Sequence, residues 1–203
     1  MTSEAAPDPI EEAARAALDG GLVVFPTDTV YGIAARPDDP AATARLFEAK
    51  GRPRELELPV LVPSTEAARA IAVFDERAEA LAVRWWAGPL TIVLPRSQRS
   101  RAWDLGGDPA TIGVRMPHHV LALAILAKTG PLAVTSANRS GEPPGSTCVE
   151  LEATFGDDVQ AYLCEEGPLE NNASTVVDLS TTVWRMLRVG AITELDVEAA
   201  LTG

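Results

Sequence analysis

The strongest constraint on the fold is a regular alternation of short apolar segments with segments that carry helix-capping residues. Apolar, largely β-branched runs predict strands near residues 22–25, 58–62, 90–95, 111–116, 132–136, 161–164, 174–179 and 183–188. Asp-Pro pairs, Ser or Thr caps and glycine stops predict helices over residues 8–20, 39–51, 64–71, 75–86 and 120–130 and at the C-terminus after residue 193. This order, with some strands adjacent in sequence, predicts an α/β protein with a twisted, mixed β-sheet flanked by helices.

The length and composition indicate one folded domain. The chain has 203 residues, of which 46% are hydrophobic, which is enough to form a core. Neither an internal repeat nor a linker-like stretch interrupts it, so we expect a single domain over residues 1–203. No apolar run is long enough to cross a bilayer, and the acidic N-terminal segment does not resemble a signal peptide. We therefore expect a cytoplasmic protein whose two cysteines, Cys148 and Cys164, are reduced thiols.

The charge balance limits the kind of partner. Seventeen Lys and Arg residues face twenty-nine Asp and Glu residues, which gives a net charge of −12. Tight, unspecific binding of nucleic acid depends on neutralising phosphates, so we expect no stable nucleic-acid binding and no membrane partner. Net charge does not describe a single cleft, however, and a local basic pocket for a small anion is compatible with it.

Polar stretches follow three of the predicted strands and one predicted helix: PTDTVYG at 26–32, SANRSG at 136–141, Arg188-Val189-Gly190, and AKGRPRE at 49–55. Each alone also fits ordinary turn chemistry, helix capping or a surface charge. Together, four cations (Lys50, Arg52, Arg115 and Arg188) would suit a triphosphate. Hydroxyl groups of Thr27, Thr29, Ser136, Ser140 and Ser174 would orient a small polar substrate. The P-loop and GxGxxG patterns are both absent, so a nucleotide would need a different kind of site.

Seven motifs occur in one order along the chain: PTDTVYG, AKGRP, GPLTIVL, GVRMP, TSANRSG, STVVD and LRVG. From about residue 21 to 190 the sequence thereby resembles the YrdC-like threonylcarbamoyl-AMP synthases. The resemblance implies a nucleotidyltransferase with a deep electropositive cleft, which forms threonylcarbamoyl-AMP and pyrophosphate from L-threonine, bicarbonate or CO2, and ATP with Mg²⁺. It also implies that a separate transferase passes the threonylcarbamoyl group to an adenosine of tRNA.

The same resemblance assigns roles to individual residues. L-Threonine would be bound by Thr27, Tyr31, Arg115, Ser136 and Ser174. ATP would be bound by Lys50, Arg52, Thr111, Asn138, Ser146 and Arg188, with Lys50 and Arg52 as the catalytic pair. Tyr31 would line the cleft, and Gly32 would let the chain turn. No metal site made of protein ligands is expected, because Mg²⁺ would arrive with ATP.

Other conspicuous residues are given structural roles. His118 and His119 are expected to start a helix after Pro117, and Trp85 and Trp86 are expected in the core. A structural or capping role is favoured for Asp28, although it could also assist proton transfer.

The chain departs from the family pattern near the predicted nucleotide site. Five residues separate Pro53 from Pro59 where three are more usual, Pro63 replaces a frequent histidine, and Gly145-Ser146 replaces a proline-threonine pair. Two alternatives stay open: a related carbamoyl or adenylyl transferase acting on another amine, and an RNA-binding module.

Overall fold

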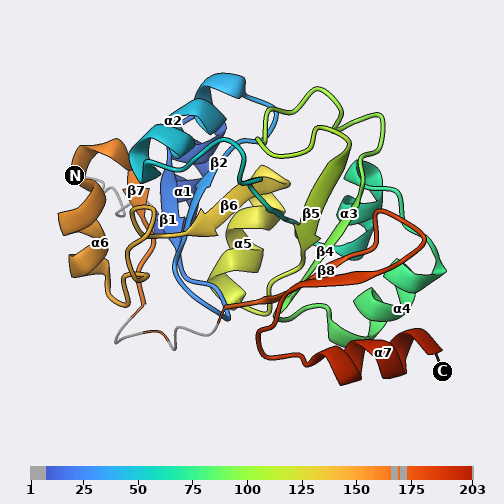
Figure 1. Cartoon of the computed structure of the whole chain (residues 1–203). Helices are drawn as coiled ribbons and strands as arrows, with labels where there is room; N and C mark the ends of the chain where they lie inside the picture. Colours follow the sequence, from blue (N-terminus) through green and yellow to red (C-terminus); the bar gives the residue numbers. More distant parts are fainter. Residues whose placement is uncertain (1–7, 166–168, 170–172, 203) are drawn as a thin grey trace, which may run out of the picture.

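The computed structural model describes residues 8–165, 169 and 173–202, and within them nine strands form one mixed sheet (Figure 1). The strands are β1 (Val23–Phe25), β2 (Gly32–Ala35), β3 (Val60–Leu61), β4 (Leu90–Pro95), β5 (Thr111–Arg115), β6 (Leu132–Ser136), β7 (Ala161–Tyr162), β8 (Thr175–Asp178) and β9 (Arg185–Arg188). Their order is β7-β1-β2-β6-β3-β5-β4-β8-β9, with parallel and antiparallel neighbours. The predicted mixed α/β architecture is confirmed.

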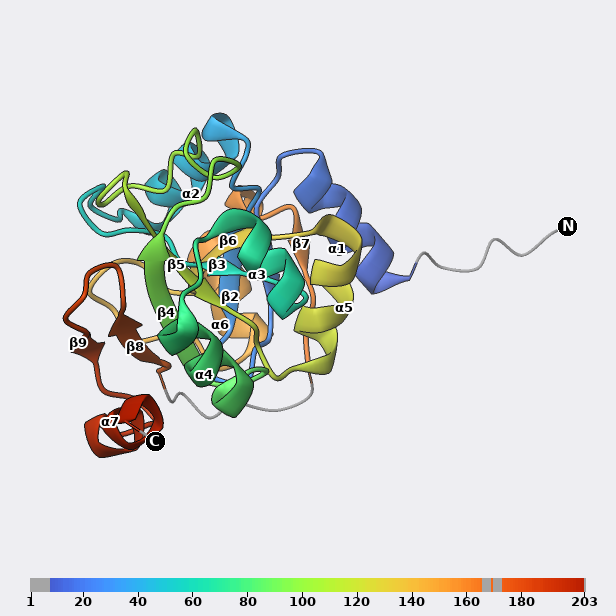
Figure 2. The same cartoon turned by 90° about the vertical axis from the view of Figure 1, so that its right-hand side faces the viewer.

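Helices cover this sheet. They are α1 (Pro9–Leu18), α2 (Pro40–Lys50), α3 (Thr65–Ile71), α4 (Glu76–Trp85), α5 (Val120–Thr129), α6 (Cys148–Phe155) and α7 (Glu194–Thr202), with a short 3-10 turn at Gly156–Asp158. Helices α1 and α5 lie side by side (Figure 2) and share a small core cluster with β1 and β6. The larger core cluster combines strand residues with helical residues from α2, α3, α4, α6 and α7. Within the described part of the chain, no helix is both long and apolar enough to cross a bilayer.

The predicted caps explain where the helices begin. The side chains of Asp8 and Asp39 accept hydrogen bonds from backbone N–H groups in the first turns of α1 and α2, and a proline follows each. His119 is the N-cap residue of α5, as expected from the sequence. Trp85 and Trp86 are partly buried against the larger core cluster, which confirms their structural placement.

Strand β2 was not predicted, and it changes how the first polar stretch is understood. The chain does not leave the sheet after β1 but returns directly as an antiparallel partner, with Phe25 opposite Gly32. Residues 26–31 are therefore a hairpin loop. Gly32 lies in the strand rather than turning the chain: a Cβ there would lie 2.5 Å from a methyl group of Val134 on β6. The glycine permits close strand approach, and the expected turning role is wrong.

The expectation of reduced cysteines is also wrong. Cys148, the first residue of α6, forms a disulfide with Cys164, just after β7, and their Cα atoms are 5.9 Å apart. The sequence could not show this, because the proximity arises only when α6 and the following 3-10 turn bring β7 back beside β1. A reduced state is the usual default for distant cysteines, and here tertiary structure overrides it.

Candidate active site

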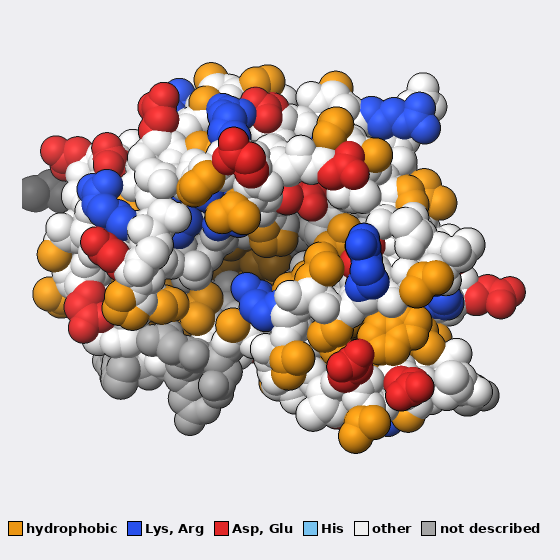
Figure 3. All heavy atoms as spheres, in the orientation of Figure 1, with side chains coloured by type: hydrophobic (Ala, Val, Ile, Leu, Met, Phe, Trp, Pro, Cys, Tyr) orange, Lys and Arg blue, Asp and Glu red, His pale blue; other side chains and the backbone are white. Residues whose placement is uncertain are grey.

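A cavity of about 590 Å³ opens near the middle of one face of the molecule. Figure 3 shows a hollow there with hydrophobic side chains on its floor and Lys or Arg side chains beside it. Its polar and charged lining residues are Thr27, Thr29, Arg52, Glu55, Glu57, Thr91, Arg115, Thr135, Ser136, Ser174 and Arg188. Six of the residues given threonine- or ATP-binding roles are thus brought together from six separate segments: Thr27, Arg52, Arg115, Ser136, Ser174 and Arg188.

The hairpin loop between β1 and β2 lines one side of the cavity and is held together by its own hydrogen bonds. Thr27 Oγ1 donates to the carbonyl of Val30 at 2.6 Å and accepts from the N–H groups of Thr29 and Val30. The hydroxyls of Thr27 and Thr29 lie 3.0 Å apart, and Thr29 Oγ1 also accepts from Arg115 Nη1 at 2.9 Å. Most of the bonding capacity of the predicted substrate residue Thr27 is therefore used within the turn.

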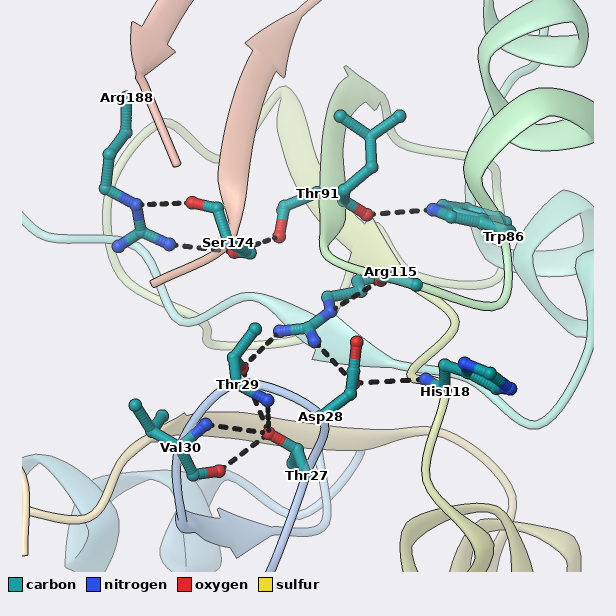
Figure 4. Close-up of polar contacts among 12 residues, drawn as sticks. Thr27, Asp28, Thr29, Val30, Trp86, Thr91, Arg115, His118, Ser174 and Arg188 are labelled. Carbon is teal, nitrogen blue, oxygen red and sulfur yellow. Dashed lines mark hydrogen bonds and ion pairs between the residues drawn. The ribbon is translucent and has the colours of Figure 1, made fainter. Parts of the chain in front are cut away.

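Arg115, at the end of β5, is anchored on three sides (Figure 4). Besides Thr29, its Nη2 donates to Asp28 Oδ1 at 2.6 Å, and its Nε donates to the carbonyl of Gly88 at 3.0 Å. Asp28 Oδ1 also accepts from the His118 N–H at 3.0 Å. Burial lowers the pKa of the Arg115 guanidinium, and the neighbouring Asp28 carboxylate opposes that shift. Asp28 thus has the structural role that the sequence favoured.

Arg188, at the end of β9, also lines the cavity and lies apart from Asp28 (Figure 4). Its Nε and Nη2 donate to the carbonyl and the hydroxyl of Ser174, both at 2.8 Å. The Ser174 hydroxyl is also 3.1 Å from that of Thr91 on β4. Since β4 and β8 are parallel neighbours, this network links strands that are far apart in the sequence.

Arg52 follows the C-terminus of α2 and is held by the segment that differs from the family pattern. Its Nε donates to the carbonyl of Leu56 at 3.1 Å and its Nη2 to that of Glu57 at 3.0 Å. The pKa of the Arg52 guanidinium is lowered mainly by burial and, to a smaller extent, by the positive charge of the nearby Arg188. Among the described residues, neither Arg52 nor Arg188 has a carboxylate within ion-pairing distance, so both positive charges face the cavity uncompensated.

Lys50 does not belong to the cavity lining. Its ammonium lies beneath the 136–140 loop and donates to the carbonyls of Ser136 and Asn138, each at 2.5 Å. The Ser140 N–H in turn donates to the Lys50 carbonyl at 2.8 Å. Burial, with a smaller contribution from Arg52, lowers the pKa of Lys50 to about 7. Its predicted catalytic role stays a prediction, and its visible role is to fasten this loop to the end of α2.

The other predicted site residues lie away from the main cavity. Tyr31 is fully buried in the core, where its hydroxyl accepts from the Glu165 N–H at 3.0 Å, so it does not line the cleft as expected. Asn138 and Ser146 border an adjoining hollow of about 310 Å³. Thr111 begins β5 and donates to the Asp108 carbonyl at 3.4 Å. The structure therefore separates these four residues from the six that share the main cavity.

The sequence did not predict four of the polar lining residues, Glu55, Glu57, Thr91 and Thr135, and two of them show why. Thr91 lies inside an ordinary apolar strand pattern, and only its pairing with β8 brings it to Ser174. Glu57 reaches the wall from the unusual five-residue segment, and its Oε1 is buried without a hydrogen-bond partner, 3.6 Å from Arg96 Nη2. Burial raises the pKa of the Glu57 carboxyl to about 8. In the sequence, the extra length of that segment was the one feature that could have drawn attention to Glu57.

Comparison with known proteins places these features in a family context. A family model for Sua5, YciO and YrdC proteins, described as "Telomere recombination", matches residues 15–190. A Mycobacterium tuberculosis relative is 41% identical over 185 residues, covering 90% of this chain and 84% of the relative. A threonylcarbamoyl-AMP synthase of Pyrococcus abyssi is 37% identical over 194 residues, covering 95% of this chain and 57% of that enzyme. The crystal structure of Pyrococcus abyssi Sua5 complexed with L-threonine superposes with a TM-score of 0.85 at 35% identity, again over 95% of this chain and 57% of that one.

Proposed function

Because the chain belongs to the Sua5/YciO/YrdC family, we propose that it is a threonylcarbamoyl-AMP synthase. The proposed reaction condenses L-threonine, bicarbonate or CO2, and ATP. The amine of threonine forms a carbamate with CO2, a carbamate oxygen attacks the α-phosphorus, and pyrophosphate leaves. Relatives that carry this enzyme name are 33–37% identical over most of the chain, which supports the assignment.

The single observation that carries the proposal is the uncompensated positive charge on one side of the cavity. Arg52 and Arg188 each use two N–H bonds on backbone or hydroxyl oxygens, which leaves three N–H bonds on each guanidinium. Arginine forks match phosphate oxygens in geometry and charge. These two residues would therefore orient the triphosphate and neutralise charge that develops on the departing pyrophosphate.

Arg115 is suited to a smaller group. In the described structure three of its five N–H bonds are already used, so one remains on each terminal nitrogen. Two such donors match one carboxylate, and the neighbouring Ser136 and Ser174 add hydroxyls on the cavity wall. L-Threonine would thus bind beside Arg115, with its amine directed into the cavity.

Mg²⁺ would accompany ATP, and the acidic lining residues fit that arrangement. Magnesium in nucleotide sites usually takes one or two protein carboxylates together with phosphate oxygens and water. Glu55 and Glu57 line the cavity, and Glu57 Oε1 is a buried oxygen without a hydrogen-bond partner, 3.6 Å from Arg96 Nη2. Bound magnesium would supply charge neutralisation at the phosphates, and Glu57 is the residue that would contact it.

The test is pyrophosphate release by the purified protein with ATP, Mg²⁺ and bicarbonate, with and without L-threonine. Release that requires threonine, and that falls when serine replaces it, supports both the reaction class and the substrate. Threonine-independent release would favour another amine as the substrate. Salt-steep RNA binding without any release would instead favour the RNA-binding alternative.

The destination of the product is part of the same proposal. A threonylcarbamoyl adenylate is a reactive mixed anhydride, so a tRNA threonylcarbamoyl transferase would have to receive it before water hydrolyses it. A cytoplasmic location would match that partnership. Adding such a transferase and unmodified tRNA to the assay should convert the adenylate into modified adenosine.

A further inference from the structure

The hairpin loop at residues 27–29 contains more polar groups than turn formation requires. Thr27 alone caps the turn, since its hydroxyl bonds both the carbonyl and the N–H of Val30. The side chains of Asp28 and Thr29 play no part in that capping and instead meet the guanidinium of Arg115. We infer that Asp28 and Thr29 are positioning residues that fix the orientation of Arg115 for substrate binding; this rests on the proposed function.

The direction of the hydroxyl hydrogen bonds follows from the available donors. Thr27 spends its one hydroxyl proton on the Val30 carbonyl at 2.6 Å, so it must act as an acceptor toward Thr29. Thr29 therefore donates to Thr27, and its own oxygen accepts from Arg115 Nη1 at 2.9 Å. The hydrogen bonds therefore run from Arg115 through the two hydroxyls to a backbone carbonyl.

Asp28 fixes the other terminal nitrogen. Its Oδ1 lies 2.6 Å from Arg115 Nη2 and is itself anchored by the His118 N–H. With Gly88 bonded to Nε, each of the three guanidinium nitrogens has a different partner. A planar group contacted at all three nitrogens cannot rotate without breaking a buried hydrogen bond, and Arg115 is only 6% exposed. Its two remaining N–H bonds are thereby held in one direction.

Neither side chain is expected to contact the substrate directly. Asp28 is not among the lining residues; Thr29 is, but its hydroxyl is already occupied as donor and acceptor. Both act through Arg115. Removing either should loosen the arginine and weaken the recognition of threonine while ATP recognition, which depends on the opposite wall, stays nearly unchanged.

The variants Thr29→Val and Asp28→Asn test this, with Thr29→Ser as the conservative variant that keeps the hydroxyl. Thr43→Val is the matched control, because Thr43 is a buried threonine of α2 whose hydroxyl bonds the Pro40 carbonyl outside the cavity. The first measurement is hydrogen exchange of the Arg115 Nε–H in ¹⁵N-labelled protein without ligand. The second is the KM for threonine and for ATP in pyrophosphate release.

Thr29→Val and Asp28→Asn should each speed the exchange at Arg115 at least about 10-fold and raise the KM for threonine by a similar factor, corresponding to about 1.4 kcal/mol. The KM for ATP should change less than about twofold, and Thr29→Ser should behave like the unmodified protein. Unchanged exchange, an equal rise in both KM values, or the same effect in Thr43→Val would overturn the inference. If the unmodified protein needs no threonine, the proposed function fails, and the exchange rates still decide the positioning role.

Discussion

Arg115 and Arg188 border the same cavity in opposite electrostatic surroundings (Figure 4). Arg115 is almost fully buried, and Asp28 lies 2.6 Å away as its counter-charge. Arg188 is more exposed, and within the part of the chain that the structure describes it donates only to the neutral oxygens of Ser174. It also lies near a second arginine, Arg52, whose pKa is lowered by burial and then by the charge of Arg188. The end of the cavity at Arg115, where Asp28 compensates the positive charge, suits one small carboxylate. The end at Arg188 and Arg52, which we call the uncompensated end, suits a polyanion. An acidic protein can therefore bind ATP, because the charge that matters is local.

Arg115→Ala should produce the largest change in stability. It leaves the partly buried Asp28 without its cation, and because breaking a fully buried pair costs about 3–5 kcal/mol, the loss should be at most of that size. Denaturant unfolding measures the loss, and the double variant Arg115→Ala with Asp28→Asn should recover much of it. If the double variant is as unstable as the single one, charge compensation is not what distinguishes this end of the cavity. In any folded fraction, the threonine requirement should rise far more than the ATP requirement.

Arg188→Ala should leave the fold largely intact and weaken nucleotide binding. Loss of charge-assisted hydrogen bonds to phosphate costs about 1.5–3 kcal/mol, or roughly 10- to 150-fold in affinity. Calorimetric titration with ATP checks this, and Arg188→Lys should recover only part of the affinity, since an ammonium lacks the planar fork. Unchanged ATP affinity in Arg188→Ala would contradict the assignment of the uncompensated end to the triphosphate.

Lys50→Met tests the attachment of the 136–140 loop, which carries the cavity residue Ser136. Without the ammonium, the carbonyls of Ser136 and Asn138 lose a buried donor, and we expect a loss of about 1–3 kcal/mol in the free energy of unfolding. ATP use should fall as well. Lys128→Met removes an exposed ion pair with Glu11 and should leave stability nearly unchanged. A Lys50→Met protein of normal stability that is nevertheless inactive would indicate direct catalysis rather than loop attachment.

Glu57→Gln should have the smallest effect on stability, visible mainly as a pH dependence. The pKa of Glu57 is raised to about 8 from 4.5, so between these values the folded protein binds more protons than the unfolded chain. This carboxyl therefore stabilises the fold less as pH rises from 5 to 8. The free energy of unfolding of Glu57→Gln, relative to the unmodified protein, should increase over that range. Glu55→Gln, an exposed neighbour on the same segment, should show no such trend.

Local sequence patterns predicted secondary structure well where a residue acts only on its immediate neighbours in the chain, as a helix cap does. Asp8 and Asp39, each followed by proline, marked the starts of α1 and α2, because a capping carboxylate and a fixed φ act within one turn. Strand β2 was missed because GIAA contains two alanines and a glycine, which have low strand propensity. Its strand conformation comes from pairing on both sides with β1 and β6.

By itself, the sequence determined the mixed α/β class, the family, and the segments that carry Thr27, Arg52, Arg115, Ser136, Ser174 and Arg188 to the cavity. Motif order and capping residues encode these properties locally, and they do not depend on how the strands pair. Only the tertiary structure decided that Tyr31 is in the core, that Cys148 meets Cys164, and that Asp28 pairs with Arg115 while Arg188 has no carboxylate partner among the described residues. The physical reason is that burial and charge compensation depend on distances between side chains that are far apart in sequence, and the packing of strands, helices and loops sets those distances.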